Sequence, residues 1–131
     1  MIRILFVDQD PTLLEALRVR LQPCRRDWDM DFANSQETAL ARLSQRPFDM
    51  LVTEVDPGAW DGANLLRIAE LCYPQMKRIA FTSGCKFTQL EPKRADAFLP
   101  KPSDRDTIDR LVSQFFPLEP QRQEAGVEPF L

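Results

Sequence analysis

Five short apolar segments recur along the chain, and segments with helical spacing separate them. The apolar segments span residues 2–7, 28–33, 48–55, 78–82 and 96–99. The first and third are almost continuously apolar, which is typical of strands covered on both faces, whereas the second alternates with Asp and indicates a strand nearer a sheet edge. Because strands and helices alternate, the pattern predicts an α/β fold with a parallel sheet and helices on both faces.

Start and stop signals bound the helices. Asp10-Pro11 begins the first helix, because Asp is a good N-cap and Pro fits the first turn. Asn34 or Ser35 caps the second helix, and Ser103 with Asp106 resembles a capping box for the last one. The segment 87–95 carries Pro92 and little periodicity, so the fourth helix is expected to be short or irregular.

Size and composition bound the class of protein. The 131 residues fit one domain, predicted over 1–116, and the Pro-, Gln- and Glu-rich residues 117–131 form a tail or linker. The net charge of -3 gives no stripe of Lys and Arg for nucleic acid. No apolar run is long enough to span a bilayer and the N-terminus turns acidic early, so we expect a cytoplasmic protein without membrane contact.

The cysteine and histidine content excludes several kinds of site. The chain has no histidine, and its three cysteines are widely separated without a CxxC pair, so zinc, haem and disulfide frameworks are not expected. Cys24 and Cys72 are predicted to be small apolar fillers, and Cys85 an exposed thiol with nothing to make it reactive.

Polar residues stand at the carboxyl ends of four of the predicted strands. Asp8 follows the first, Glu54 lies at the end of the third, Thr82 ends the fourth and Lys101 follows the fifth. In open α/β sheets, ligands bind beyond these strand ends. Four residues of complementary chemistry at four strand ends therefore predict a common site.

Residues 1–116 resemble a response regulator receiver domain. The matching segments are ILFVDQDP, FDMLVTEVDPGAWDG, RIAFTSG and ADAFLPKPSD, and WDMDFANS with DGANLLRIAE is similar to receivers that precede HDOD-type output domains. The resemblance implies a flavodoxin-like (CheY-like) three-layer sandwich with strand order 2-1-3-4-5. It also implies bacterial two-component signalling, in which an Asp at the end of the third strand takes phosphate from a histidine kinase.

In this sequence the phosphoacceptor position of the family is Glu54. Asp61-Gly62 follows it at the spacing of the family's Asp-Gly, which fixes the alignment. Moving the acceptor to Asp56 would break that spacing and place Pro57 directly after it. The phosphoacceptor Asp is therefore expected to be missing.

The acidic pair that holds Mg²⁺ in the family corresponds to Asp8 and Gln9, so one carboxylate is replaced by an amide. Mg²⁺ prefers hard carboxylate oxygens, and we expect no cofactor and at most weak Mg²⁺ binding, through Asp8, Glu54 and the carbonyl of Asp56. Asp10 adds charge nearby but is expected to cap the helix. With nucleophile and metal both altered, phosphotransfer and enzymatic activity are not expected.

The residues that grip the phosphoryl group in the family are retained as Lys101 and Thr82, with Ser83 as an alternative to Thr82. Phe98 occupies the family's aromatic switch position, although a strand in this place buries an aromatic residue in any case. Two roles are open for Glu54: it partly mimics the phosphorylated state, or it only pairs with Lys101 so that a buried charge is satisfied.

Three functions remain in competition. The leading hypothesis is a receiver without phosphoacceptor that binds a protein partner. The alternatives are a working receiver that uses another acidic residue with weak Mg²⁺, and a different flavodoxin-like protein such as a flavin carrier. A homodimer is possible, although the interval from Thr82 to Lys101 is short for the family and puts a standard receiver dimer in doubt.

Overall fold

The computed structural model describes residues 1–22, 27–55, 62–83 and 95–117. Its centre is a five-stranded sheet in the order β2-β1-β3-β4-β5, and each neighbouring pair is parallel. This order confirms the predicted topology and places β2 at an edge. The strands are β1 (Ile2–Val7), β2 (Trp28–Ala33), β3 (Met50–Glu54), β4 (Lys77–Thr82) and β5 (Ala97–Pro100).

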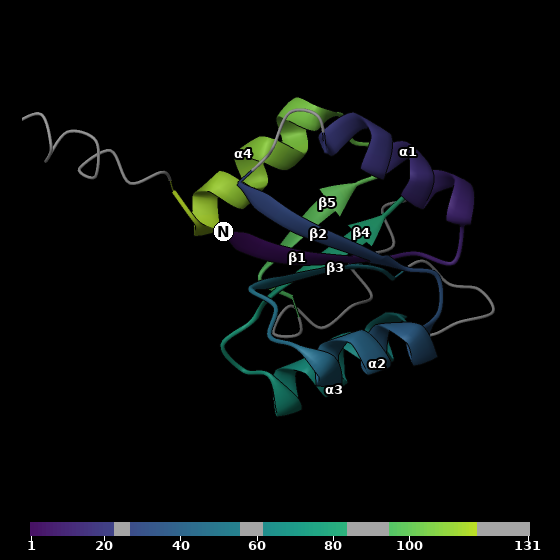
Figure 1. Cartoon of the computed structure of the whole chain (residues 1–131), viewed down its shortest axis with the longest axis vertical. Coiled ribbons are helices and arrows are strands. Elements are labelled where there is room, and N and C mark those ends of the chain that lie inside the picture. The colour runs from purple at the N-terminus through teal and green to yellow at the C-terminus, as the bar shows by residue number, and fades with distance from the viewer. Residues whose placement is uncertain (23–26, 56–61, 84–94, 118–131) are drawn as a thin grey trace, which may run out of the picture.

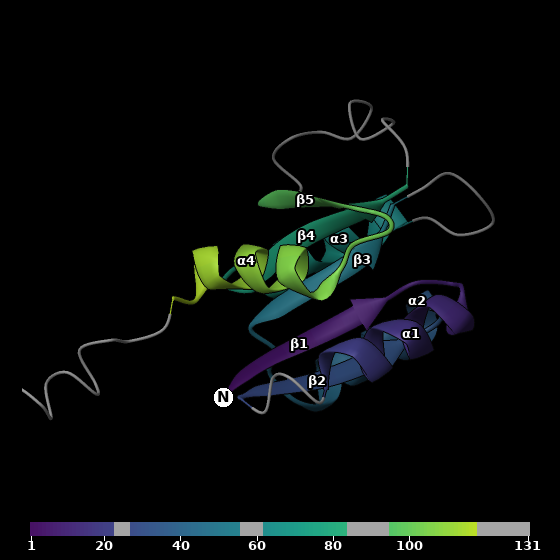
Figure 2. The ribbon, with the colours of Figure 1, turned by 90° about the horizontal axis from the view of Figure 1, so that it is seen from above.

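Helices cover both faces of the sheet, which gives the three layers seen in Figures 1 and 2. Two helices lie on one face, α1 (Pro11–Leu21) and α4 (Arg105–Phe115), and two lie on the other, α2 (Gln36–Gln45) and α3 (Gly62–Cys72). The predicted short fourth helix falls mostly within residues 84–94, outside the described residues. α4 therefore corresponds to the last helix predicted from the sequence.

Strand side chains alternate between two cores, because successive residues of a strand point to opposite faces. Ile4 and Phe6 of β1 pack against α1 and α4, while Leu5 and Val7 pack against α2 and α3. All four are at most 1% exposed. The continuous apolar run at 2–7 thus reflects a central strand that both helix layers cover.

The third strand is shorter than its apolar pattern suggests. It spans Met50–Glu54 rather than 48–55, although ladder hydrogen bonds continue on either side of it. Asp49 N–H donates to the carbonyl of Arg3 at 2.8 Å, and Val55 N–H donates to that of Phe81 at 3.1 Å. The flanking residues are therefore held by the sheet without belonging to the strand itself.

The predicted helix caps are confirmed at two helices and wrong at the third. Asp10 caps α1 and Ser35 caps α2. The last helix is capped by Asp104, which accepts a hydrogen bond from Thr107 N–H at 2.8 Å, and not by Ser103. The Ser103 hydroxyl instead donates to the carbonyl of Pro100, so the helix begins one residue later.

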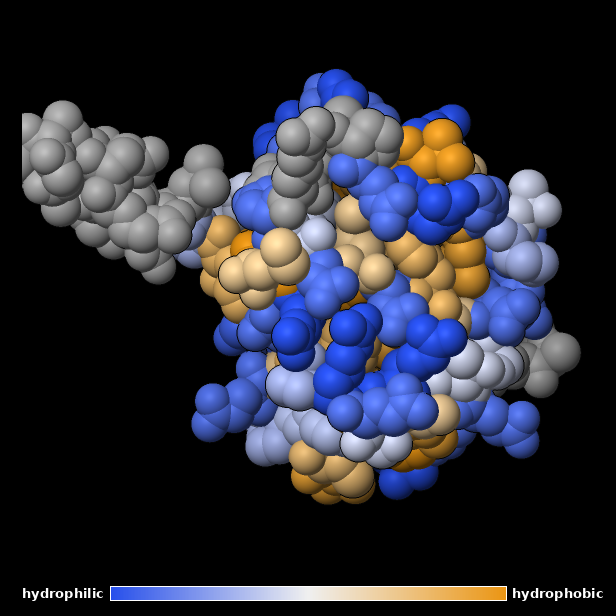
Figure 3. Space-filling view, in the orientation of Figure 1, coloured by the Kyte–Doolittle hydropathy of each residue, from blue (hydrophilic) through white to orange (hydrophobic). Residues whose placement is uncertain are grey.

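Two acidic residues on the edge strand β2 form a chain of ion pairs with α2. Asp31 contacts Arg42 at 2.5 Å and Arg46 at 3.1 Å, and Asp29 contacts Arg46 at 3.4 Å and Arg3 at 3.5 Å. Figure 3 shows a hydrophilic surface over the region between β2 and α2 and an apolar area between β2 and α1. The Asp residues that alternate along this strand are thus paired with arginines in α2, directly after α2 and in β1.

Cys72 is exposed, so its prediction as a buried filler is wrong. It is the last residue of α3, beyond the turns whose Leu65, Leu66 and Ala69 are buried. Cys24 and Cys85 lie outside the described residues. None of the helices in the described ranges has the length and apolar character needed to cross a membrane.

Candidate functional site

Three of the four strand-end residues meet at one end of the sheet. Asp8 directly follows β1, Glu54 ends β3 and Lys101 directly follows β5. Backbone bonds hold the last of these in place, because Lys101 N–H donates to the carbonyl of Thr82 at 2.8 Å. Parallel strands bring their carboxyl ends to the same edge, which explains why residues up to 93 positions apart in sequence become neighbours.

One ammonium group joins the two carboxylates. Lys101 Nζ lies 2.7 Å from Asp8 Oδ2 and 3.1 Å from Glu54 Oε2. Asp8 is 1% exposed and Glu54 is 5% exposed, so these charges are nearly removed from water. With two carboxylates and one ammonium, the ionised cluster carries a net charge of about -1.

The remaining oxygen of each carboxylate faces a backbone donor. Asp10 N–H donates to Asp8 Oδ1 at 2.9 Å, and Gln9 N–H donates to Glu54 Oε1 at 3.2 Å. The turn after β1 therefore supplies two N–H groups to the site. All four carboxylate oxygens are next to a positively polarised protein group.

Burial and pairing shift the pKa values of the cluster. The pKa of Asp8 is raised above its ordinary 3.8, because burial disfavours the carboxylate more than the Lys101 and Asp10 contacts favour it, with Glu54 adding repulsion. Burial alone would lower the pKa of Lys101, but its bonds to Asp8 and Glu54 together raise it above 10.5. The ammonium therefore stays charged at neutral pH.

An aromatic ring completes the surroundings of the ammonium. Lys101 Nζ lies 5.1 Å from the ring centroid of Phe81, within the range of a cation–π contact. Phe81 is buried on β4 and pairs with Glu54 in the register of β3 and β4. Sequence reasoning missed Phe81, although its place one residue before Thr82 is the signal that could have found it.

The other predicted site residues within the described ranges lie on or beside β4, on β5 and in the turn after β1. Thr82 is buried at the end of β4, Ser83 is exposed beside it, and Phe98 is half-buried on β5, packed against the α2/α3 side of the sheet. Asp10 uses its side chain to accept from Thr12 N–H, as expected for a helix cap. Asp56 lies outside the described residues.

The donor set does not suit Mg²⁺ as it stands. Mg²⁺ needs near-ideal octahedral coordination and prefers carboxylate oxygens, whereas every oxygen of Asp8 and Glu54 is already contacted by a protein donor. Gln9 contributes an amide in place of a second acidic residue. In the described part of the chain, no three Asp, Glu, His or Cys side chains are grouped to hold a metal ion.

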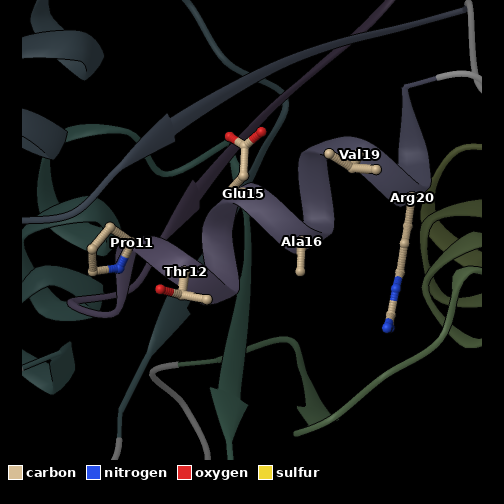
Figure 4. Close-up of a pocket in the computed structure, with 6 residues that line it drawn as sticks. All are labelled: Pro11, Thr12, Glu15, Ala16, Val19 and Arg20. Atoms are coloured by element: carbon tan, nitrogen blue, oxygen red, sulfur yellow. The ribbon is translucent and has the colours of Figure 1, made fainter.

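Two hollows on the surface lie along α1 and not over this cluster. The larger, of about 550 Å³, is lined by successive turns of α1, and Thr12, Ala16 and Arg20 point to the same side of the helix (Figure 4). The second, of about 280 Å³, lies between α1 and the start of α2. Neither hollow is lined by Asp8, Glu54 or Lys101.

Comparison with known proteins identifies the family. Residues 4–113 match the response regulator receiver domain. The chain is 28% identical to the response regulator protein PilR of Pseudomonas aeruginosa, over 96% of this chain and 29% of that protein, so it spans less than a third of this relative.

Solved structures support the same fold. The signal receiver domain of an HD domain-containing protein from Pseudomonas fluorescens Pf-5 superposes with a TM-score of 0.76 at 23% identity, covering 98% of this chain and 93% of that one. The response regulator TrrA of Thermotoga maritima, solved with Mg²⁺ and BeF, also gives 0.76 at 23% identity, over 87% and 98%. These matches leave no support for the flavin-carrier alternative: the chain belongs to the response regulator receiver domain family.

Proposed function

We propose that this receiver domain acts in two-component signalling by binding a protein partner without taking up phosphate. The observation that carries the proposal is the buried contact between Lys101 and Glu54, at 3.1 Å. The resemblance assigns these positions to the phosphate-gripping lysine and the phosphoacceptor. In this chain the Lys101 ammonium and the Glu54 carboxylate form an ion pair, and the Glu54 side chain is one methylene longer than that of Asp.

The geometry also supports a nucleophile turned away from an incoming phosphate. Glu54 Oε2 faces Lys101 and Oε1 faces Gln9 N–H, so both oxygens are held by the protein. Misplacement of a reacting group by about 1 Å can lower a rate around a hundredfold. The amide of Gln9 removes a negative charge that would help to hold the metal, which opposes phosphotransfer further.

A small phosphodonor tests the proposal directly. The full chain is incubated with Mg²⁺ and acetyl phosphate, and in parallel with beryllofluoride, and the products are analysed by intact-protein mass spectrometry and by intrinsic fluorescence. The wild type is expected to give no adduct. The double variant Glu54→Asp/Gln9→Asp restores both acids of the family pattern and serves as the matched positive control.

A phosphoryl adduct on the wild type would refute the proposal and favour the alternative, a working receiver that uses another acid. Repeating the reaction with Glu54→Gln and with Asp56→Asn would then locate the acceptor. Loss of the adduct in only one of the two variants identifies the residue.

The partner is a protein, either an output domain or a regulatory protein, and the site of action is the cytoplasm. Measuring the affinity for the partner distinguishes the two roles open for Glu54. If Glu54 partly mimics the phosphorylated state, Glu54→Asp and Glu54→Gln both weaken partner binding. Unchanged affinity in both variants leaves Glu54 as a charge partner of Lys101 alone.

A further inference from the structure

We infer that the Lys101 ammonium takes the place of the divalent cation in this site and excludes it, so that removal of Lys101 opens a metal site at Asp8 and Glu54. This inference deepens the proposed function and rests on it. Under this inference, the strand-end site holds Lys101 in place of a metal ion.

The positive charge of Lys101 lies between the two carboxylates of the site. Lys101 Nζ lies within 3.1 Å of an oxygen from each carboxylate, so it bridges the two acids as a bound cation would. Both acids are at most 5% exposed, and the lysine side chain is 10% exposed. A second cation would have to approach the fixed ammonium closely with little water between them to screen the repulsion.

The two buried carboxylates, Asp8 and Glu54, need a positive charge or a proton to offset their negative charges. With Lys101 present the cluster holds about one uncompensated negative charge, and without it the same buried space holds two. Paired buried carboxylates are strongly driven either to bind a proton or to bind a cation. Their backbone contacts to Asp10 N–H and Gln9 N–H keep them oriented at the strand ends.

Lys101 is also held by contacts that do not involve the two acids. The Lys101 ammonium lies 5.1 Å from the centroid of the Phe81 ring, and the Lys101 backbone N–H donates to the carbonyl of Thr82. The cation–π contact and the anchored backbone hold the ammonium over the carboxylates. A metal ion therefore competes with a positioned group rather than with a mobile surface lysine.

Mn²⁺ binding to the full chain tests the inference, measured by electron paramagnetic resonance of the free ion and by calorimetry. Lys101→Met removes the charge and keeps the length of the side chain over Phe81. Lys77→Met is the matched control, because it makes the same change at a lysine that lies 5.8 Å from the Phe115 ring. The double variant Lys101→Met/Asp8→Asn removes one of the two carboxylates.

Lys101→Met is expected to bind Mn²⁺ at least about tenfold more tightly than the wild type and Lys77→Met, and the added Asp8→Asn change to abolish the gain. If Lys101→Met does not fold, Lys101→Gln keeps hydrogen-bond donors for both acids without the charge. No gain in either variant, or a wild type that binds Mn²⁺ as tightly as they do, overturns the inference. A phosphoryl adduct on the wild type would overturn the proposed function instead, so the two failures are distinguishable.

Discussion

Replacing Asp8 by Asn is expected to stabilise the fold at neutral pH. Asp8 is buried, and the raised pKa means that its charged form is disfavoured in the folded state relative to the unfolded one. Asn has nearly the same shape, and its amide oxygen can still accept from Asp10 N–H. Lys101 keeps Glu54 as its partner, so the remaining pair is neutral.

The geometry gives the size of the competing effects. Losing the 2.7 Å contact between Lys101 and Asp8 costs about 6 kcal/mol at an effective dielectric constant of about 20. Because both carboxylates contact one nitrogen, their nearest oxygens lie at most about 6 Å apart, and removing their repulsion returns about 3 kcal/mol. Removing the desolvation of a buried carboxylate returns several kcal/mol more. The expected net gain is about 1–2 kcal/mol.

Urea denaturation at several pH values measures this gain, and thermal melts should show a rise of about 4 °C per kcal/mol for a domain of this size. In the wild type, the folded state holds the Asp8 proton more tightly than the unfolded state. Wild-type stability therefore falls as the pH rises from about 3.8 through the raised pKa. The advantage of Asp8→Asn should be small near pH 4 and should grow as the pH rises through the raised pKa.

Asp106→Asn, an exposed Asp to Asn change on α4, is the matched control and should alter the free energy of unfolding by less than about 0.5 kcal/mol. An Asp8→Asn variant that is less stable than the wild type at pH 7 would refute the reasoning. The attraction between Asp8 and Lys101 would then outweigh burial and repulsion together.

Further predictions concern the same cluster and the helix and edge contacts. The pKa of Lys101 is raised above 10.5, so its ion pairs stabilise the fold fully below that pH, and this contribution is lost as the pH rises through the folded-state pKa. Urea denaturation at alkaline pH should therefore show a fall in the free energy of unfolding that the Lys101→Met variant lacks. Asp31→Ala should cost about 1 kcal/mol, and a double-mutant cycle with Arg42→Ala should show coupling well below that of a buried pair, because Arg42 is 39% exposed. Asp104→Ala should cost about 1 kcal/mol through loss of the helix cap, whereas Ser103→Ala should leave the Thr107 N–H bonded, as amide hydrogen exchange can verify.

The parallel sheet and the meeting of its strand ends were predictable from the alternation of apolar and helical segments, and the strand order from the resemblance to receiver domains. Parallel strands joined by helices place Asp8, Glu54 and Lys101 at one edge whatever their side chains do. The limits of β3 were less predictable, since Phe48 and Val55 are apolar but lie outside the strand itself. Apolar character reports burial, and Phe48 is buried although it precedes the strand.

The contacts within the site were only partly predictable. Pairing of Lys101 with Glu54 was among the hypotheses, but the shorter contact is to Asp8, and backbone N–H groups from the turn supply the rest. Such contacts depend on side-chain rotamers and on turn geometry, which spacing alone does not determine. The N-cap of α4 differs from the prediction for a related reason. Ser103 and Asp104 are both good N-cap residues, but the Ser103 hydroxyl donates to the carbonyl of Pro100, and Asp104 caps the helix.

The ion pairs along β2 bear on how the domain behaves when copies crowd together. An open strand edge is a template on which another chain can add, and such growth leads to aggregation. In β2, Asp31 pairs with Arg42 of α2, and both Asp29 and Asp31 pair with Arg46, which follows that helix, so a strand that docked there would meet paired charges. If the domain acts by binding a protein partner, as proposed, these ion pairs also keep backbone-mediated association at the sheet edge from competing with that binding.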